Sequence, residues 1–176
     1  MMFPVAFLVA CCLSRIAYVE ADCTQGPFDG WKTIVGTGDG YFYIKKSTSF
    51  YENLCTYSQP PTDPTTERKK SAFKSGYKDA SGDWQHPSGI AVGIDNRIIY
   101  IFGDKKKKYQ LLYSDYRNCY VTYKPQELEL WVHSGETDPD AMECCNKVFG
   151  TELRARKLQG TTLRKMDKDC SPYQVQ

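Results

Sequence analysis

Acidic and aromatic side chains alternate with aliphatic ones in the segment that runs from Glu127 to His133. Successive side chains of a β-strand point to opposite faces, so one face carries Glu127, Glu129, Trp131 and His133. A carboxylate beside an indole ring can bind a cation, because the carboxylate supplies charge and the ring supplies a cation–π surface. The opposite face is aliphatic and consists of Leu128, Leu130 and Val132.

A helix is predicted shortly after this strand, because Asp138 can cap it and Pro139 suits its first turn. Apolar side chains then recur at helical spacing: Met142, Cys145, Phe149 and Leu153. The aliphatic face of the strand offers this helix a surface to lie on, so the acidic and aromatic face would point inward. A carboxylate facing inward is costly unless it is paired, hydrated or able to bind a cation. An ordinary solvent-exposed sheet face is the alternative.

Short β-like segments recur along the chain at the spacing of hairpins. Eight strands are predicted, over 41–46, 54–57, 72–78, 90–94, 97–102, 109–114, 119–123 and 127–133. Turn signals separate them, among them Asp95-Asn96 and Gly103-Asp104. Eight antiparallel strands suffice for a small closed barrel around one ligand, whereas a β-sandwich is the alternative that spacing does not exclude. A short helix carrying Trp31 is predicted over 28–35.

The first residues have the features of a signal peptide. An apolar run from Met2 to Leu13 precedes Val19 and Ala21, small residues that fit cleavage before Asp22. The run is too short to cross a bilayer. We therefore predict a signal peptide over 1–21 and one secreted domain over 22–176, with no membrane partner.

The chain has eight cysteines, and two of them, Cys11 and Cys12, fall in the predicted signal peptide. The six others are Cys23, Cys55, Cys119, Cys144, Cys145 and Cys170. An even number in a secreted chain predicts three disulfides, although the sequence alone does not fix their pairing. The adjacent Cys144 and Cys145 are expected to bridge to different parts of the chain. Zinc is the alternative, but no Cys-x-x-Cys motif is present, and we predict no metal and no cofactor.

The net charge of +2 is too small to indicate a nucleic-acid partner. The one dense basic run, four lysines over 105–108, follows Gly103-Asp104 and is predicted to be a solvated hairpin tip, with a polyanion contact as the alternative. The sequence lacks a Gly-x-Ser-x-Gly motif and a Gly-rich phosphate loop, so an enzyme is not expected. The cysteines are too widely spread for a small disulfide-rich protease inhibitor.

The chain resembles the tick salivary lipocalins, especially the histamine-binding and soft-tick argasid branch. The resemblance rests on Gly30-Trp31, Leu54-Cys55-Thr56-Tyr57, Gly76-Tyr77-Lys78-Asp79-Ala80-Ser81-Gly82, Glu129-Leu130-Trp131-Val132-His133-Ser134 and Cys144-Cys145. It implies an eight-stranded antiparallel barrel with a C-terminal helix packed outside. It also implies the bridges Cys23–Cys144, Cys55–Cys170 and Cys119–Cys145. Members of this family sequester host mediators, namely histamine, serotonin, leukotrienes and thromboxane, and some bind complement.

The family's amine-binding pattern is matched in part. The matching residues are Cys119, Val121, Glu129, Leu130, Trp131 and Cys144. Tyr120 departs from the pattern, because amine binders of this family have an acid at that position. Loss of one of two carboxylates weakens a buried ammonium site. The tyrosine adds apolar area and a hydroxyl, which favours a larger amphipathic ligand.

We therefore expect a secreted salivary scavenger that captures small host mediators in its barrel. Eicosanoids, in particular cysteinyl leukotrienes, are the preferred ligands. Biogenic amines such as serotonin and histamine are the alternative, and they need a polar pouch with at least two inward acids. Complement binding is a further alternative, and we expect a monomer. The predicted ligand-binding residues are Trp31, Tyr43, Tyr120, Glu129, Trp131 and His133.

Overall fold

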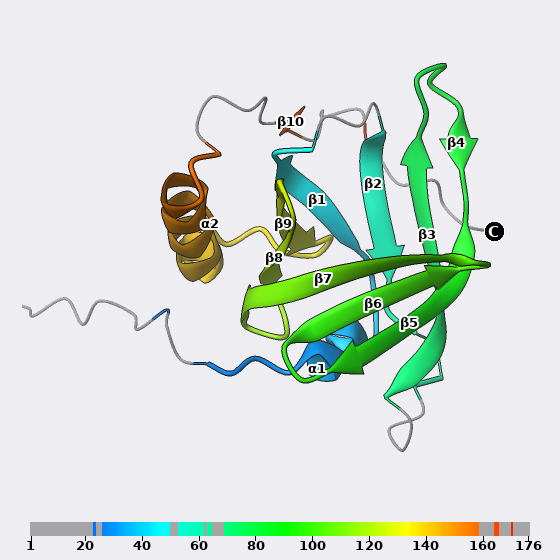
Figure 1. Ribbon diagram of the computed structural model, residues 1–176, viewed down its shortest axis with the longest axis horizontal. Helices are drawn as coiled ribbons and strands as arrows, with labels where there is room; N and C mark the ends of the chain where they lie inside the picture. The colour runs from blue at the N-terminus through cyan, green and yellow to red at the C-terminus, as the bar shows by residue number, and fades with distance from the viewer. Residues whose placement is uncertain are drawn as a thin grey trace, which may run out of the picture.

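The computed structural model describes Cys23, residues 26–49, 53–61, 63–64, 69–158 and 164–165, and Cys170. The predicted signal peptide over 1–21 lies outside these residues. The elements shown in Figure 1 are α1 (Gly30–Val35), β1 (Phe42–Ser47), β2 (Leu54–Gln59), β3 (Lys70–Lys78), β4 (Trp84–Gln85), β5 (Ser88–Ile94), β6 (Arg97–Phe102), β7 (Lys105–Ser114), β8 (Cys119–Lys124), β9 (Glu127–His133), a 3-10 turn (Asp140–Met142), α2 (Glu143–Ala155) and β10 (Arg164–Lys165). Within this part of the chain, no helix combines the length and apolar character needed to cross a bilayer.

Eight of the strands close into an antiparallel barrel. β1, β2, β3, β5, β6, β7, β8 and β9 follow one another around the ring, and β9 pairs with β1 to close it. The two-residue strands β4 and β10 lie off the ring and pair with β3 and β1. Closure confirms the predicted barrel and excludes the sandwich. All eight predicted strands are present, with ends that shift by a few residues.

The four lysines of the basic run are exposed to solvent beside a hairpin turn, as predicted. The chain reverses at Gly103, whose positive φ of 56° favours glycine, and the β6–β7 ladder begins directly after the turn. The four lysines therefore form the first part of β7. Lys105 and Lys107 are exposed but also line the cavity, whereas alternation along the strand places Lys106 and Lys108 on its other face.

The aliphatic face of β9 is covered by α2, as predicted. Leu128 and Leu130 are fully buried there with Val132, and they pack in one cluster with Met142 and Phe149 of the helical segment. The disulfides are Cys23–Cys144, Cys55–Cys170 and Cys119–Cys145, which confirms the pairing that the family resemblance implies. Two of these bridges hold α2, since Cys144 and Cys145 lie in its first turn. The inward direction of Glu129 and Trp131 follows from this outer packing.

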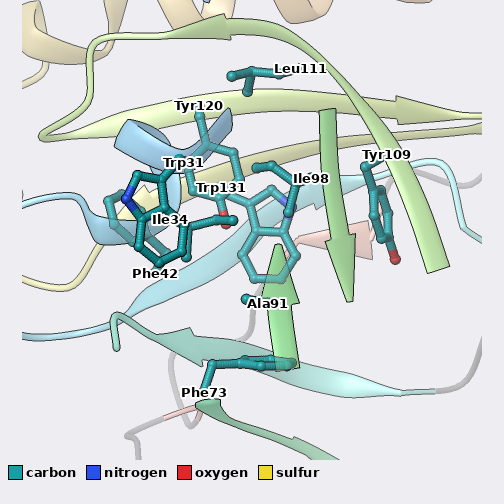
Figure 2. Packing of buried hydrophobic residues seen from close by; sticks show 10 residues of the cluster. All are labelled: Trp31, Ile34, Phe42, Phe73, Ala91, Ile98, Tyr109, Leu111, Tyr120 and Trp131. Carbon is teal, nitrogen blue, oxygen red and sulfur yellow. The ribbon is translucent and has the colours of Figure 1, made fainter. Parts of the chain in front are cut away.

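A second cluster fills the end of the barrel near α1. Its residues are Trp31, Ile34, Phe42, Phe73, Ala91, Ile98, Tyr109, Leu111, Tyr120 and Trp131 (Figure 2). The Asp29 carboxylate caps α1 by accepting hydrogen bonds from the backbone N–H groups of Trp31 and Lys32, at 2.8 and 3.0 Å. A Cβ atom at Gly93 would lie 2.1 Å from the Trp31 backbone nitrogen, so glycine is required where β5 meets the helix. The helix therefore closes this end of the barrel.

The packing of β9 against α2 predicts a large cost for shortening Leu130. We expect Leu130→Ala to lower the free energy of unfolding by about 2–5 kcal/mol, because the deleted atoms leave a cavity between barrel and helix. Urea denaturation with the disulfides intact measures this change. The matched control is Leu54→Ala, since Leu54 is 47% exposed, and its effect should stay within about 0.5 kcal/mol. Equal effects of the two substitutions would contradict the assignment of this face to the core.

Candidate ligand-binding site

A cavity of about 470 Å³ lies in the half of the barrel away from α1. This volume falls within the range of about 300–1,000 Å³ that is usual for small-molecule sites. Its aromatic lining residues are Tyr57, Phe73, Tyr77, Tyr100, Phe102, Tyr109 and Trp131. Its charged lining residues are Lys105, Lys107, Lys124, Glu127 and Glu129. An apolar aromatic interior with a few polar groups is typical of a ligand site.

Glu129 is the most deeply placed charged group of this cavity. It is only 4% exposed, because the alternation of β9 turns it inward between the outward Leu128 and Leu130. Its Oε2 atom accepts hydrogen bonds from Trp131 Nε1 at 2.9 Å and from Thr122 Oγ1 at 3.3 Å. Both donors are neutral, so they orient the carboxyl group without cancelling its charge.

Glu127 is the second inward acid of the same strand. It lies two residues from Glu129 on the same inward face and forms an ion pair with Lys124 across the β8–β9 hairpin. Burial, together with the charge of the neighbouring Glu127, raises the pKa of Glu129 to about 8. The hydrogen bond from Trp131 and the charge of Lys124 act against this rise.

Tyr120 packs beneath the cavity rather than lining it. Its ring is buried and stacks on Trp131, with ring centroids 5.6 Å apart and an angle of 12° between the planes. Its hydroxyl group donates a hydrogen bond to Tyr100, and Tyr100 is the tyrosine that lines the cavity. Burial raises the pKa of Tyr100 to about 12 and places that of Tyr120 well above its usual value, so both stay neutral. The predicted ligand-binding role of Tyr120 stays a prediction, and the structure places the residue in the buried cluster rather than in the cavity lining.

The structure separates the six predicted ligand-binding residues. Glu129 and Trp131 lie in the cavity wall, whereas Trp31 and Tyr120 belong to the buried cluster at the closed end. His133 lies at that end too, where its ring meets Phe42 at 5.2 Å and its Nε2 atom is 3.1 Å from the Asp39 carbonyl oxygen.

Tyr43 is on the wrong face for a cavity residue. It packs against the outer cluster under α2, because its neighbours Phe42 and Ile44 point inward. The alternation of apolar residues in this strand is too weak to show which face is buried, since Tyr43 and its inward neighbours are all apolar or aromatic.

Several cavity residues were missed by the sequence reasoning. Tyr57, Tyr100 and Lys124 line the cavity but were not predicted to do so. Tyr100 could have been found, because it alternates with the inward Ile98 in β6. Lys124 gave no such signal, since its position depends on the turn that joins β8 to β9.

The closed antiparallel barrel, the helix packed outside it and the interior cavity define a lipocalin. The fold is that of ligand-binding carriers, which are generally not enzymes. The chain belongs to the tick histamine-binding protein family, whose model, "Tick histamine binding protein", matches residues 29–172. No group of three or more possible metal ligands occurs among the residues that the structure describes.

Solved structures support the same fold. A crystal structure of AM182 in complex with serotonin has a TM-score of 0.71 and 24% identity, and the match covers 85% of this chain and 95% of that one. Insecticyanin from the tobacco hornworm Manduca sexta has a TM-score of 0.53 at 14% identity, covering 73% and 77% of the two chains. The siderocalin Ex-FABP has a TM-score of 0.54 at 14% identity, covering 78% and 95%. At sequence identities of 14–24%, these similarities support a shared fold.

The buried carboxyl group predicts an unusual pH dependence of stability. A glutamate ionises near 4.5 in the unfolded chain, whereas the folded protein holds the Glu129 proton up to a pKa of about 8. Between these values the folded state binds more protons, so the free energy of unfolding falls as the pH rises, by up to about 1.4 kcal/mol per pH unit. Glu129→Gln should remove this contribution.

Urea denaturation of both proteins from pH 5 to pH 8 measures the difference. The variant should gain stability relative to the parent protein as the pH rises. Glu143→Gln, an exposed position at the start of α2, is the control and should follow the parent protein at every pH. Parallel curves for Glu129→Gln and the parent protein would show that Glu129 ionises normally.

Proposed function

We propose that this protein is a secreted, monomeric scavenger that captures a biogenic amine in its barrel. Glu129 carries the proposal, because it is a nearly fully buried carboxyl group in the wall of an aromatic cavity. Its hydrogen-bond donors among the described residues are neutral, and a second acid lies beside it. A ligand ammonium would provide the missing positive charge at short range, where the low polarity of the site strengthens the attraction.

The cavity also supplies the second acid that an amine site needs. The sequence offered Tyr120 at the family's acidic position, which argued against an amine. Glu127 lines the cavity beside Glu129, so two carboxyl groups are present without an acid at position 120. This observation reverses the preference for leukotrienes that the sequence alone suggested.

The aromatic lining suits the ring of such a ligand. Tyr100 and Trp131 lie on the cavity wall near Glu129, and aromatic faces attract both a ligand ring and an ammonium group. The volume of about 470 Å³ lies in the lower part of the usual range, which fits a single ring system with a short amine arm. AM182, which has a similar fold, was crystallised in complex with serotonin, and this supports the proposal.

A cysteinyl leukotriene is the second candidate, and one observation favours it. Lys105 and Lys107 place two ammonium groups on the cavity wall next to the β6–β7 turn. These groups could bind the carboxylates of an amphipathic lipid while Glu129 holds its amino group. Complement binding, by contrast, concerns loop surfaces and stays a sequence-based prediction.

The amine proposal predicts that Glu129→Gln weakens serotonin binding. Loss of the charged partner of a buried ammonium costs about 2–5 kcal/mol, so the affinity should fall by about 30-fold or more. Calorimetric titration with serotonin and histamine measures this change, with Glu143→Gln as a control that keeps the parent affinity. Tight binding of leukotriene C4 together with no response to either amine would contradict the amine proposal.

The leukotriene candidate makes a different prediction. In the double variant Lys105→Met and Lys107→Met, leukotriene C4 affinity should fall by at least about tenfold, because each lost charge-assisted contact is worth about 1.5–3 kcal/mol. Serotonin affinity should stay equal or rise, since two like charges are removed from the cavity. The control is Lys106→Met with Lys108→Met, on the outer face of the same strand. Equal leukotriene affinities for the two double variants would exclude this candidate.

A further inference from the structure

The Glu127–Glu129 pair has a chemical requirement of its own. Two carboxylates buried side by side repel each other, so double ionisation of such a pair is disfavoured. Glu127 and Glu129 are both buried on the inward face of β9 in the cavity wall, and Lys124 forms an ion pair with Glu127. Glu129 is the deeper of the two and accepts hydrogen bonds from neutral donors, so the proton of the pair is assigned to it.

We propose that a bound amine takes the place of this proton, so that ligand capture releases a proton and strengthens as the pH rises. The inference rests on the proposed amine-binding function and adds its chemical mechanism. In the free protein, the proton on Glu129 removes the negative charge of its carboxyl group. In the complex, a ligand ammonium at Glu129 would instead offset that charge and donate N–H hydrogen bonds to the carboxylate. The site then exchanges one cation for another rather than burying a new charge.

The hydrogen bonds of Glu129 fix the place of exchange. Trp131 and Thr122 both donate to its Oε2 atom, at 2.9 and 3.3 Å. The second carboxyl oxygen is then the one available for the contact with Glu127 and for an incoming N–H group. A ligand with an N–H donor on its cation meets this requirement, whereas a quaternary ammonium ion has no N–H to offer.

The other titratable groups that line the cavity or pack beside the pair are lysines and tyrosines. They are Lys124 and Tyr120 on β8, Lys105, Lys107 and Tyr109 on β7, Tyr100 on β6, Tyr77 on β3 and Tyr57 on β2. β1 contributes Ile44 and Ser47, which do not titrate. The nearest tyrosines, Tyr100 and Tyr120, stay neutral because burial raises their pKa values. The lysines are cations, and the charge of Lys124 favours the ionised pair.

The direction of the effect follows from linkage. The pKa of Glu129 in the free protein is raised to about 8, chiefly by burial, and a neighbouring ammonium lowers the pKa of a carboxyl group. Below pH 8 the free protein therefore holds a proton that the complex lacks, and the affinity rises by up to about tenfold per pH unit. Above pH 8 the free pair is ionised and the affinity levels off.

Serotonin titration by calorimetry at pH 6, 7, 8 and 9 tests the proposal. At each pH the experiment is run in phosphate and in Tris, because the difference in measured enthalpy between two buffers counts the protons released. We expect release close to one proton per serotonin at pH 6, about half at pH 8, and an affinity that rises several-fold per pH unit below pH 8. Equal enthalpies in both buffers with a constant affinity would overturn the proposal and leave the amine function intact.

Two variants assign the proton to this pair. Glu127→Gln keeps a hydrogen-bonding side chain beside Glu129 but removes the acid that repels its charge. We expect a lower affinity for serotonin, because one acid of the site is lost, and at saturating serotonin the protons released per bound ligand at pH 7 should fall well below the parent value. Lys124→Met removes the cation that favours ionisation, so release should persist to a higher pH. The control Glu143→Gln should match the parent protein, and parent-like proton release in Glu127→Gln would contradict the assignment.

A separate outcome concerns the function itself. If serotonin and histamine produce no heat and no displacement at any of these pH values, the amine-binding function and the proton exchange both fail. Binding without proton release fails only the exchange. The two failures are therefore distinguishable in one set of titrations.

Discussion

A carboxyl group buried inside a small β-barrel is the constraint on which the site depends. Ionised and unpaired, Glu129 would cost more free energy than the surrounding packing could easily offset. Two neutral donors orient it, and its burial beside Glu127 raises its pKa, so it holds its proton to a higher pH than an ordinary glutamate. Such an arrangement is stable without a ligand and is still able to bind a cation.

The direction of Glu129 is set from outside the barrel. Leu128 and Leu130 are buried beneath α2, and the disulfide Cys119–Cys145 links β8 to the same helix. A slip of one residue in β9 would place Glu129 under the helix and a leucine in the cavity. The outer hydrophobic contact and the inner polar site thus lie on the two faces of one strand. A change in the register of β9 would disrupt both.

The sequence predicted much of this fold because its strongest pattern, the alternation in β9, decides two things at once. It indicated the surface that α2 covers and the inward face that holds Glu129 and Trp131. The disulfide pairing came only from the family resemblance. What the sequence could not show is how deep each inward residue sits, since depth depends on barrel closure and strand tilt.

That missing depth explains the errors at the site. His133 and Tyr120 point inward as their positions in the strands suggest, but they lie below the cavity, where Tyr120 belongs to the buried cluster. Tyr43 was misplaced because both faces of β1 carry apolar residues. The lysine run is exposed at the β6–β7 hairpin as predicted, and the tight turn at Gly103 lets its residues extend β7 as well.

The protonation state of Glu129 can be measured directly by carbon-13 NMR of protein labelled at the glutamate carboxyl carbon, with Glu129→Gln used to assign the resonance. In the free protein the account predicts that this carbon titrates near pH 8, and that saturating serotonin at pH 7 shifts it to its ionised position. A resonance that titrates near the ordinary value of 4.5, or one that does not respond to serotonin, would contradict the account.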